Sequence, residues 1–234
     1  MKTSSLIYSL LAIGFLLILT NGCKKDDDKN IQFNPDLSYE TTTDIDGNVY
    51  RTIKIGTQTW MAENMKVTRY RNGDTIPYVT DRTEWLNLST SAYCDYGNST
   101  SNSTIYGKLY NWYAVADIRN IAPTGWHVAS DAEWTTLTTF LGGGIVAGGK
   151  LKEKGTAHWQ SPNYGATNET GFSALPGGLY LGGSFVSLGS SGNWWSCTAL
   201  SSNAWGRGMH ESYDEVHRYL SSLSFGFSVR CVKD

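Results

Sequence analysis

Alternating apolar and polar residues predict β-strands near both ends of the chain. Residues 49–55 (VYRTIKI) alternate directly after an Asp46-Gly47 turn, and residues 59–61 return as a second short strand. An Asp-Gly pair supplies the positive φ that a tight hairpin turn requires. Residues 225–232 alternate again, and this pattern places four side chains on one face, namely Phe225, Phe227, Val229 and Cys231.

Helical spacing of apolar residues predicts helices in the middle of the chain. The clearest helix begins after Ser130, which opens a Ser-x-x-Glu capping box, and ends at the three glycines 142–144. A short helix over residues 80–88 is predicted with Asp81 as its cap, and residues 107–118 also show helical spacing.

Short strands and loops, punctuated by glycine, are predicted from Val146 onward. Between the Trp194-Trp195 pair and the final strand, residues 197–224 show little periodicity, so we expect an exposed loop or short edge strands there. A Trp-anchored base that carries a mixed polar and aromatic surface is typical of a binding site. By itself it does not indicate catalysis.

The beginning of the chain has the pattern of a secretory signal. Lys2 precedes an apolar run of about 14 residues, Leu6–Leu19, which is shorter than the roughly 20 residues that a membrane-spanning helix needs. Cys23 stands at the expected cleavage point, so residues 1–22 are predicted to be a lipoprotein signal peptide and Cys23 the acylated N-terminus, with palmitate among its acyl chains. Thr20 occupies a position where such signals usually have Leu. An uncleaved anchor helix is the alternative.

Residues 23–43 are polar and lack a sustained pattern, so they are predicted to form a lipidated, flexible tether. The tether begins with Lys24–Lys29 (KKDDDK), which resembles the Lys-then-acidic signal that sends lipoproteins of the Bacteroidota to the cell surface. We therefore expect a surface-exposed lipoprotein of the outer membrane, held to its membrane by the lipid on Cys23. The remaining residues, 44–234, are expected to form one domain.

Composition indicates a domain with many loops and an aromatic core, because 9 Trp, 14 Tyr and 25 Gly accompany only 17% charged residues. Each aromatic side chain buries about 150–250 Å², so a few can replace many aliphatic residues. The net charge of −2 provides no basic surface for nucleic acid, which excludes that class of partner. Besides Cys23, the chain has Cys94, Cys197 and Cys231; we expect one disulfide and one free thiol after export, with the pairing open.

Three sequence patterns begin like a metal or phosphate site, and none of them is complete. Asp44–Asn48 (DIDGN) lacks the spacing and the distal Glu of an EF-hand, so a turn is the better interpretation. His210–Asp214 (HESYD) starts like the HExxH of zinc proteases, but Asp214 stands in place of the second His and His217 lies near the opposite face of an ideal strand. Gly148–Lys152 (GGKLK) lacks the Ser or Thr of a phosphate loop. No metal and no cofactor is therefore expected.

Eight short motifs are distributed along nearly the whole of residues 44–234. They are Trp60–Met65 (WMAENM), Tyr106–Trp112 (YGKLYNW), Ala122–Val128 (APTGWHV), Ser130–Trp134 (SDAEW), Gly148–Lys152 (GGKLK), Gly171–Gly178 (GFSALPGG), Trp194–Ser196 (WWS) and Ser228–Asp234 (SVRCVKD). Their identity and their order resemble the Fibrobacter succinogenes major paralogous domain family.

The resemblance implies an α+β, C-type-lectin-like fold with two helices, small antiparallel sheets and long loops on one side. It also implies a secreted or surface lipoprotein without established catalytic activity, for which carbohydrate binding or adhesion is the usual assignment. Cys94 and Cys231 occupy family-like positions, so the resemblance favours a disulfide between them, with Cys197 as the alternative partner. Cys197 stands where the family normally has a small polar residue.

We therefore predict a non-enzymatic, cell-surface binding or adhesion lipoprotein that recognises a carbohydrate or protein ligand through its C-terminal loop surface. Trp and Tyr stack on sugar rings and donate hydrogen bonds at low entropic cost. The Glu-Pro-Asn and Trp-Asn-Asp strings of calcium lectins are absent from the sequence, so a metal-independent site is expected. His127, next to Trp126, is expected to be a packed structural residue. The candidate ligand contacts are Trp205, Arg207, His210, Tyr213, Asp214 and His217.

Three alternatives to this function stay open at the level of sequence. Residues 197–224 mix polar and aromatic residues irregularly, as in C-type-lectin-like proteins that retroelements diversify for ligand display. The domain could instead be a structural spacer. The third alternative is an enzyme related to formylglycine-generating proteins, which share the lectin-like fold, although no matching Cys pair is found.

Overall fold

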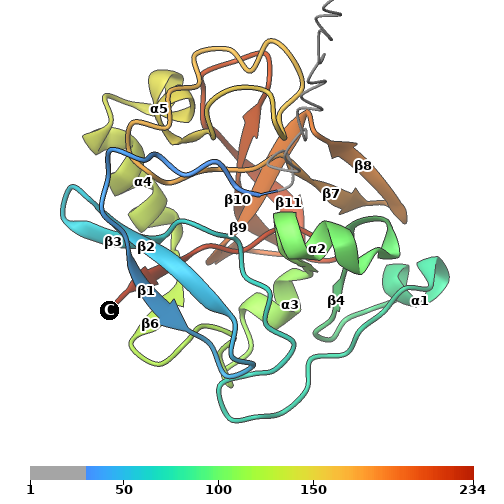
Figure 1. The fold of residues 1–234 in the computed structure, drawn as a ribbon. Coiled ribbons are helices and arrows are strands. Elements are labelled where there is room, and N and C mark those ends of the chain that lie inside the picture. Colours follow the sequence, from blue (N-terminus) through green and yellow to red (C-terminus); the bar gives the residue numbers. More distant parts are fainter. Residues whose placement is uncertain (1–29) are drawn as a thin grey trace, which may run out of the picture.

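Two five-stranded sheets organise the part of the chain that the computed structural model describes, residues 30–234 (Figure 1). The first sheet joins the two ends of the domain, because the C-terminal strand lies between a strand from the N-terminal part and one from the middle of the chain. Its order is β1 (Glu40–Thr43), β2 (Val49–Ile55), β3 (Gln58–Met61), β12 (Cys231–Lys233) and β6 (Trp126–Val128), and every neighbouring pair is antiparallel. The hairpin strands predicted after the Asp-Gly turn are thus confirmed, and Gly47 has the expected positive φ of 83°.

The second sheet is built from the C-terminal third of the chain. Its order is β11 (His217–Ser222), β10 (Asn203–His210), β9 (Ser191–Leu200), β7 (Gly177–Leu181) and β8 (Ser184–Leu188). All of its pairs are antiparallel except β7 with β9, which meet in parallel at Gly178 and Gly192. A two-stranded ladder of β4 (Tyr93–Cys94) and β5 (Leu109–Tyr110) completes the strands.

Within residues 30–234, five short α-helices cover these sheets, where residue spacing predicted three and the family resemblance implied two. They are α1 (Arg82–Leu86), α2 (Thr100–Tyr106), α3 (Trp112–Val115), α4 (Asp131–Phe140) and α5 (Gly144–Leu151), with a 3-10 turn at Tyr96–Asn98. The fold is therefore mixed α and β, with strands predominating. The cap of α1 by Asp81 and the capping box of α4 are both confirmed, since Asp81 accepts from the Glu84 amide and Ser130 from the Glu133 amide.

The helix predicted over residues 107–118 is wrong in its first half. Gly107 has a φ of 77°, and a Cβ there would lie 2.7 Å from Cβ of Asn64. The two residues of β5 then pair with β4, so only the four residues of α3 remain helical. Apolar spacing over so few residues did not distinguish a turn of helix from a short strand, because the apolar side chains are buried in the core in both cases.

The C-terminal stretch runs between two hydrophobic clusters and contributes to both. Phe227, Val229 and Cys231 belong to one cluster, and Phe225 packs against it, which confirms the predicted face. Val232 points the other way, into the cluster around Trp60, Trp134 and Trp194. Regular pairing is confined to β12, while the residues before it make isolated bridges to β5, β7 and β9.

Arg230 lies at the centre of this arrangement and is fully buried. Its guanidinium donates to Oδ1 of Asn64 at 2.6 Å and to the carbonyl oxygens of Met61, Phe172 and Ser173 at 2.8, 2.8 and 3.2 Å. Burial lowers the pKa of Arg230 to about 9 because it disfavours the charged form. Three sequence motifs, around Trp60, Gly171 and Arg230, therefore meet at one buried cation.

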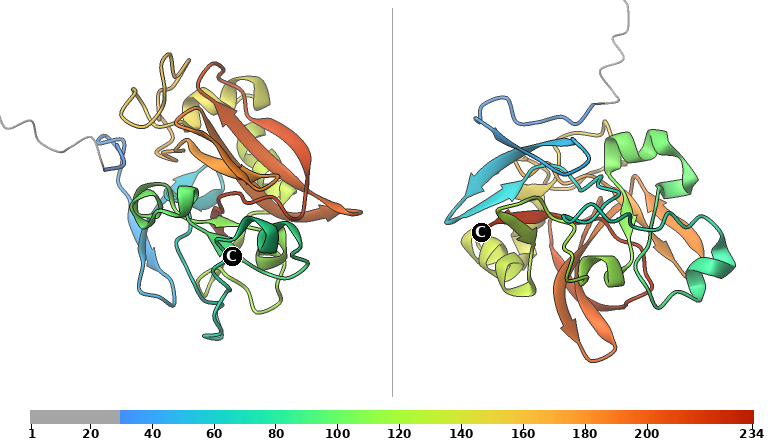
Figure 2. Two further views of the ribbon diagram at one scale, coloured as in Figure 1. Left: turned by 90° about the vertical axis from the view of Figure 1, so that its right-hand side faces the viewer. Right: turned by 90° about the horizontal axis from the view of Figure 1, so that it is seen from below.

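Residues 30–43, predicted as the second half of a free tether, pack on the domain. The amide of Gln32 donates to Oε1 of buried Glu153 at 2.6 Å, and Leu37 and Tyr39 pack against the cluster around Trp60. Residues 40–43 form β1 at the edge of the first sheet. We call residues 30–39 the N-terminal strap. In Figure 1 it lies beside the loop of residues 160–173, and both views of Figure 2 show the turn between β9 and β10 on the opposite side of the molecule.

The predicted signal peptide, the lipidated Cys23 and the first part of the tether lie outside the described residues. Within residues 30–234, no helix combines the length and the apolar character needed to cross a membrane.

The predicted disulfide is not formed, since Cys94, Cys197 and Cys231 are all free thiols. Cys94 belongs to the cluster around Trp85, whereas Cys231 belongs to the cluster around Trp195, so the two side chains have different neighbours. Cys197 is exposed. Burial raises the pKa of each of the Cys94 and Cys231 thiols well above the ordinary value. Both are therefore poor nucleophiles, because the reactive thiolate form is disfavoured.

Candidate functional site

The segment predicted as an exposed loop or short edge strands, residues 197–224, is mostly regular β-structure, and β11 lies at the edge of its sheet. β9, β10 and β11 form a continuous antiparallel sheet in which Gly206 pairs with Tyr219 and Gly208 with His217. Side chains of a strand alternate between its two faces, so this sheet divides the predicted ligand contacts into two groups. The sequence pattern hid the strands because glycine alternates with large residues in β10.

One face of the sheet carries a shallow cleft that contains three of the six predicted contacts. His210, Tyr213 and His217 line it together with residues of β9 and β11, and its volume is about 330 Å³. Because residue 208 is glycine, the Tyr219 ring can pack closely over it at the floor of the cleft. A Cβ at Gly208 would lie 3.0 Å from the Tyr219 ring and 3.3 Å from Oδ1 of Asn193. We call this hollow the ring cleft.

The three rings of the ring cleft follow one another in space. The centroids of His210 and Tyr213 are 5.6 Å apart, and those of Tyr213 and His217 are 6.2 Å apart. Tyr213 is 56% exposed, so its ring face is accessible to a ligand. Below the rings, the Tyr219 hydroxyl donates to Oδ1 of Asn193 at 2.6 Å. The cleft thus combines an exposed aromatic series with fixed polar groups at its base.

Lys152 holds the loop that carries two of these rings, and sequence reasoning did not single it out. Its ammonium group is buried and donates to the carbonyl oxygens of Tyr164, His210 and Tyr213 at 2.9, 3.0 and 2.7 Å. Burial lowers the pKa of Lys152 to about 8, and the nearby carboxylates of Asp214 and Glu211 oppose that shift.

The glycines that precede Lys152 explain the GGKLK motif. A Cβ at Gly148 would lie 2.5 Å from the carbonyl oxygen of Glu215, and one at Gly149 would lie 2.4 Å from that of Gly165. Only glycine therefore allows α5 to pack this closely against the loop. The two glycines of the motif thus serve close backbone contact, and Lys152 follows directly after the last residue of α5.

Trp205 and Arg207 lie on the other face of the sheet, against α4. Arg207 is only 2% exposed and forms an ion pair with Oδ1 of Asp131 at 2.6 Å. Its guanidinium is therefore not accessible as the ligand contact that the sequence predicted. Arg218 pairs with the same carboxylate at 2.9 Å and stacks 3.4 Å above the Trp205 ring. Burial raises the pKa of Asp131, but hydrogen bonds from Arg218 and Arg207 outweigh it and lower that pKa overall.

Asp214 is separated from the ring cleft as well. Its carbonyl oxygen accepts from the Gly149 amide at 3.1 Å, and its side chain lies against Gly149 and Gly165. It supports the loop from behind. Of the six predicted contacts, the structure therefore brings together His210, Tyr213 and His217 in the cleft.

His127, which was expected to be a packed structural residue, is held by two ion pairs near the surface. Its ring is about one-third exposed and lies between two carboxylates, with Nδ1 2.7 Å from Oδ1 of Asp234 and Nε2 2.6 Å from Oε1 of Glu133. The fourth histidine, His158, is buried against Glu153 at 2.8 Å. Among residues 30–234, no group of three or more His, Cys, Asp or Glu side chains is arranged to hold a metal ion.

No curated protein and no solved structure matches the chain. A protein-family model does match it, in agreement with the sequence motifs that meet at Arg230. The family model described as the Fibrobacter succinogenes major domain matches residues 53–233, which include both sheets apart from β1 and the first residues of β2. The chain therefore belongs to the Fibrobacter succinogenes major domain family.

Proposed function

We propose that this protein is a non-enzymatic binding domain that recognises a carbohydrate in the ring cleft. The observation that carries the proposal is the series of His210, Tyr213 and His217 above a floor where Tyr219 packs on Gly208. Aromatic faces stack on the C–H faces of sugar rings, and imidazole, phenol and amide groups exchange hydrogen bonds with hydroxyls. A shallow cleft of this kind suits one or two sugar units at the end of a chain.

Pre-organisation of the cleft supports binding at low entropic cost. The Lys152 ammonium fixes the carbonyl groups of His210 and Tyr213, and the β10–β11 ladder fixes His217. Rings that are already held in place lose little freedom when a ligand arrives. The polar groups at the base of the cleft then select the orientation of the sugar.

We also propose the C-type-lectin-like arrangement as the framework of this site. The first sheet joins the N-terminal and C-terminal segments through β12. The second sheet, whose strand β9 contains Trp194 and Trp195, carries the ring cleft on one face. We further propose that acylation of Cys23 anchors the protein at the outer membrane with the domain facing outward. The support for this anchor is the signal-like sequence of residues 1–22 and the KKDDDK segment.

The test is binding of the full-length chain to a glycan array, with and without EDTA. We expect binding that persists in EDTA, because the cleft contains aromatic and amide groups rather than a carboxylate cluster. Tyr213→Ala should weaken binding by roughly tenfold or more, since stacking on an exposed ring contributes on the order of 1 kcal/mol or more. Tyr164→Ala is the matched control, because Tyr164 is equally exposed at 57% and does not line the cleft.

Three results would contradict the proposal. Loss of binding in EDTA would show a metal-dependent site. Equal losses in Tyr213→Ala and Tyr164→Ala would place the ligand elsewhere. The absence of any glycan ligand would point to a protein ligand or to a structural spacer, and would remove carbohydrate recognition from the proposal.

A further inference from the structure

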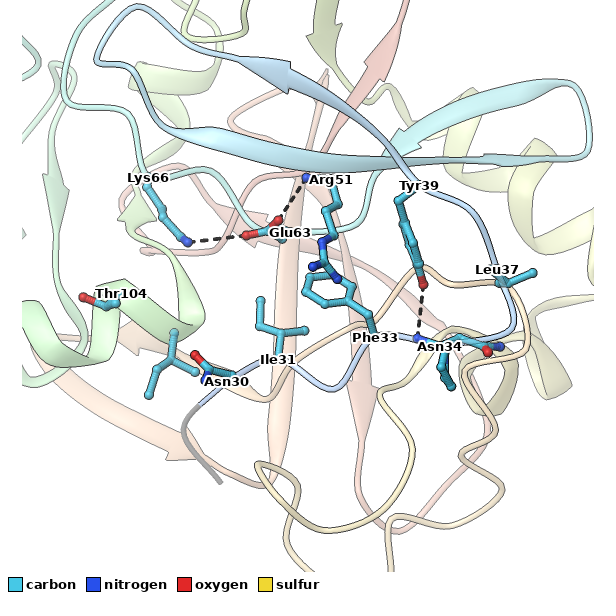
Figure 3. A pocket seen from close by; sticks show the side chains of 12 residues that line it. Asn30, Ile31, Phe33, Asn34, Leu37, Tyr39, Arg51, Glu63, Lys66 and Thr104 are labelled. Atoms are coloured by element: carbon cyan, nitrogen blue, oxygen red, sulfur yellow. Dashed lines mark hydrogen bonds and ion pairs between the residues drawn. The ribbon is translucent and has the colours of Figure 1, made fainter. Parts of the chain in front are cut away.

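A second hollow lies where the N-terminal strap meets the first sheet and α2, and it shares no lining residue with the ring cleft (Figure 3). Its volume is about 630 Å³. One wall is the strap itself and the other comes from β2, from the segment after β3 and from α2. We call it the strap pocket; the residues that matter for its chemistry are Asn30, Phe33, Arg51, Glu63, Lys66 and Thr104.

Arg51 supplies an exposed cation with a fixed orientation. Its guanidinium carbon lies 4.1 Å above the Phe33 ring and 5.8 Å from the centre of the Tyr39 ring, as Figure 3 shows. Within residues 30–234 no carboxylate forms an ion pair with this guanidinium, so its N–H edge remains available. A planar guanidinium held by stacking is well suited to bind two oxygen atoms of a phosphate at once.

Lys66 supplies a second cation on the same side of the pocket. Its Nζ is 3.5 Å from Oε2 of Glu63, whose other oxygen accepts from the Arg51 amide at 2.9 Å. Two cations and one carboxylate leave the pocket with one net positive charge. The Asn30 side-chain amide adds a hydrogen-bond donor, while Ile31 and Phe33 add apolar surface. The Thr104 hydroxyl also lines the pocket, but it donates to the Thr100 carbonyl at 3.1 Å. This combination fits a phosphate that carries a short apolar substituent.

The position of the pocket identifies the source of that phosphate. Asn30 lines it and lies seven residues after Cys23. Seven residues span at most roughly 24 Å when fully extended. If Cys23 carries the lipid anchor, the strap pocket therefore cannot lie far from the headgroups of the same membrane, because residues from Gln32 onward are docked on the domain.

We propose that the strap pocket binds the phosphate of an anionic lipid headgroup in the membrane that holds the N-terminal anchor. This inference rests on the proposed acylation of Cys23 and is independent of sugar binding in the ring cleft. Binding there would hold the strap side of the domain toward the bilayer. The turn between β9 and β10, on the opposite side, would then face away from it (Figure 2).

The experiment is calorimetric titration of the full-length chain, purified in a neutral detergent, with dihexanoyl phosphatidic acid and separately with inorganic phosphate. We expect saturable lipid binding that is at least roughly tenfold tighter than binding of inorganic phosphate, because the apolar wall contacts only the lipid. Arg51→Gln should weaken lipid binding by roughly tenfold or more. Lys54→Gln should leave it unchanged, since Lys54 lies on the same strand and does not line the pocket.

Lys66→Gln removes one positive charge from the pocket and keeps the stacking of Arg51 on Phe33, so the strap stays in place. Lipid binding should weaken in this variant too. Inorganic phosphate binding as tightly as the lipid would overturn the lipid assignment. No binding of either probe, or equal binding by all three variants, would overturn the site. Mass spectrometry of Cys23 tests the anchor separately, and Tyr213→Ala on the glycan array tests the ring cleft, so each failure is distinguishable.

Discussion

At the scale of single residues, the buried guanidinium of Arg230 joins segments that are far apart in the chain. Arg230 has four hydrogen-bond acceptors and, among residues 30–234, no carboxylate partner; three of the acceptors are backbone carbonyls. Asn64 links it to the core, since its Oδ1 also accepts from the Trp194 indole at 2.8 Å. These contacts give a physical reason for the family motifs around residues 60–65, 171–178 and 228–234.

We expect Arg230→Met to destabilise the fold by about 3 kcal/mol or more, because it leaves the carbonyls of Met61, Phe172 and Ser173 buried without a donor. Urea unfolding followed by Trp fluorescence measures the change. Arg69→Met is the control: its side chain is 53% exposed and its ion pair with Asp46 is 3.7 Å long, so the change should stay below about 0.5 kcal/mol. Similar losses in the two variants would show that Arg230 is not a structural centre.

His127 makes stability depend on pH. Burial by itself lowers its pKa, but hydrogen bonds to Asp234 and Glu133 outweigh burial and raise the pKa above its ordinary value. A pKa raised by folding means that the charged ring stabilises the native state fully below about pH 6.5 and loses this contribution as pH rises through the folded pKa.

His127→Gln should therefore reduce the melting temperature most at about pH 5–6, and the difference from the wild type should shrink at alkaline pH. Thermal unfolding at a series of pH values measures it. His217→Gln, which removes a more exposed ring 3.6 Å from a single carboxylate, is the control and should change stability little. A difference between wild type and His127→Gln that stays constant across the series would contradict the ion-pair interpretation.

At the scale of elements, the N-terminus of α4 is tied to two neighbouring strands of the second sheet. The capping box places Asp131 in the first turn, where its carboxylate pairs with Arg207 of β10 and Arg218 of β11. The first turn of a helix also favours negative charge because the backbone N–H groups point toward it. Helix capping by Ser130 and Glu133 and ion pairing by Asp131 thus occur in the same first turn of α4.

Ser130→Ala removes the hydroxyl that accepts from the Glu133 amide at 3.2 Å. We expect it to cost about 1 kcal/mol of stability, as is typical for loss of an N-cap. Chemical denaturation measures the loss. Thr136→Ala in the same helix is the control: its side chain is exposed, and alanine has the higher helix propensity, so stability should hold or rise slightly. A Ser130→Ala variant as stable as Thr136→Ala would show that the cap does not set this helix.

At the scale of the whole molecule, the N-terminal strap shortens the distance between the domain and any anchor at Cys23. It adds Phe33, Leu37 and Tyr39 to the cluster around Trp60, and Asn34 donates to the Asn168 carbonyl at 3.0 Å. Residues 30–43, predicted as tether, are therefore packed on the domain. Its orientation relative to a membrane would follow from this docking.

Tyr39→Ala should release the strap, because the Tyr39 ring packs on Gly171 and its hydroxyl accepts from the Asn34 amide at 3.2 Å. Hydrogen exchange by mass spectrometry should show protection of residues 30–39 in the wild type and at least roughly tenfold faster exchange in the variant. Tyr164→Ala should leave the strap protected. Fast exchange in the wild type as well would contradict a docked strap.

Local sequence determined the elements whose signals are short in range. The Asp-Gly turn, the β2 strand, the caps of α1 and α4 and the inward face of the last strand all follow from neighbouring residues, because turn geometry, capping and side-chain alternation act within a few positions. Family motifs likewise identified the family. Tertiary structure decided the rest: β10 was hidden by its glycines, Arg207 is buried by α4, and the thiols of Cys94 and Cys231 are in separate clusters. These outcomes depend on contacts between residues far apart in the chain. Other long-range contacts, such as those of Lys152 with the carbonyls of His210 and Tyr213, assemble the ring cleft.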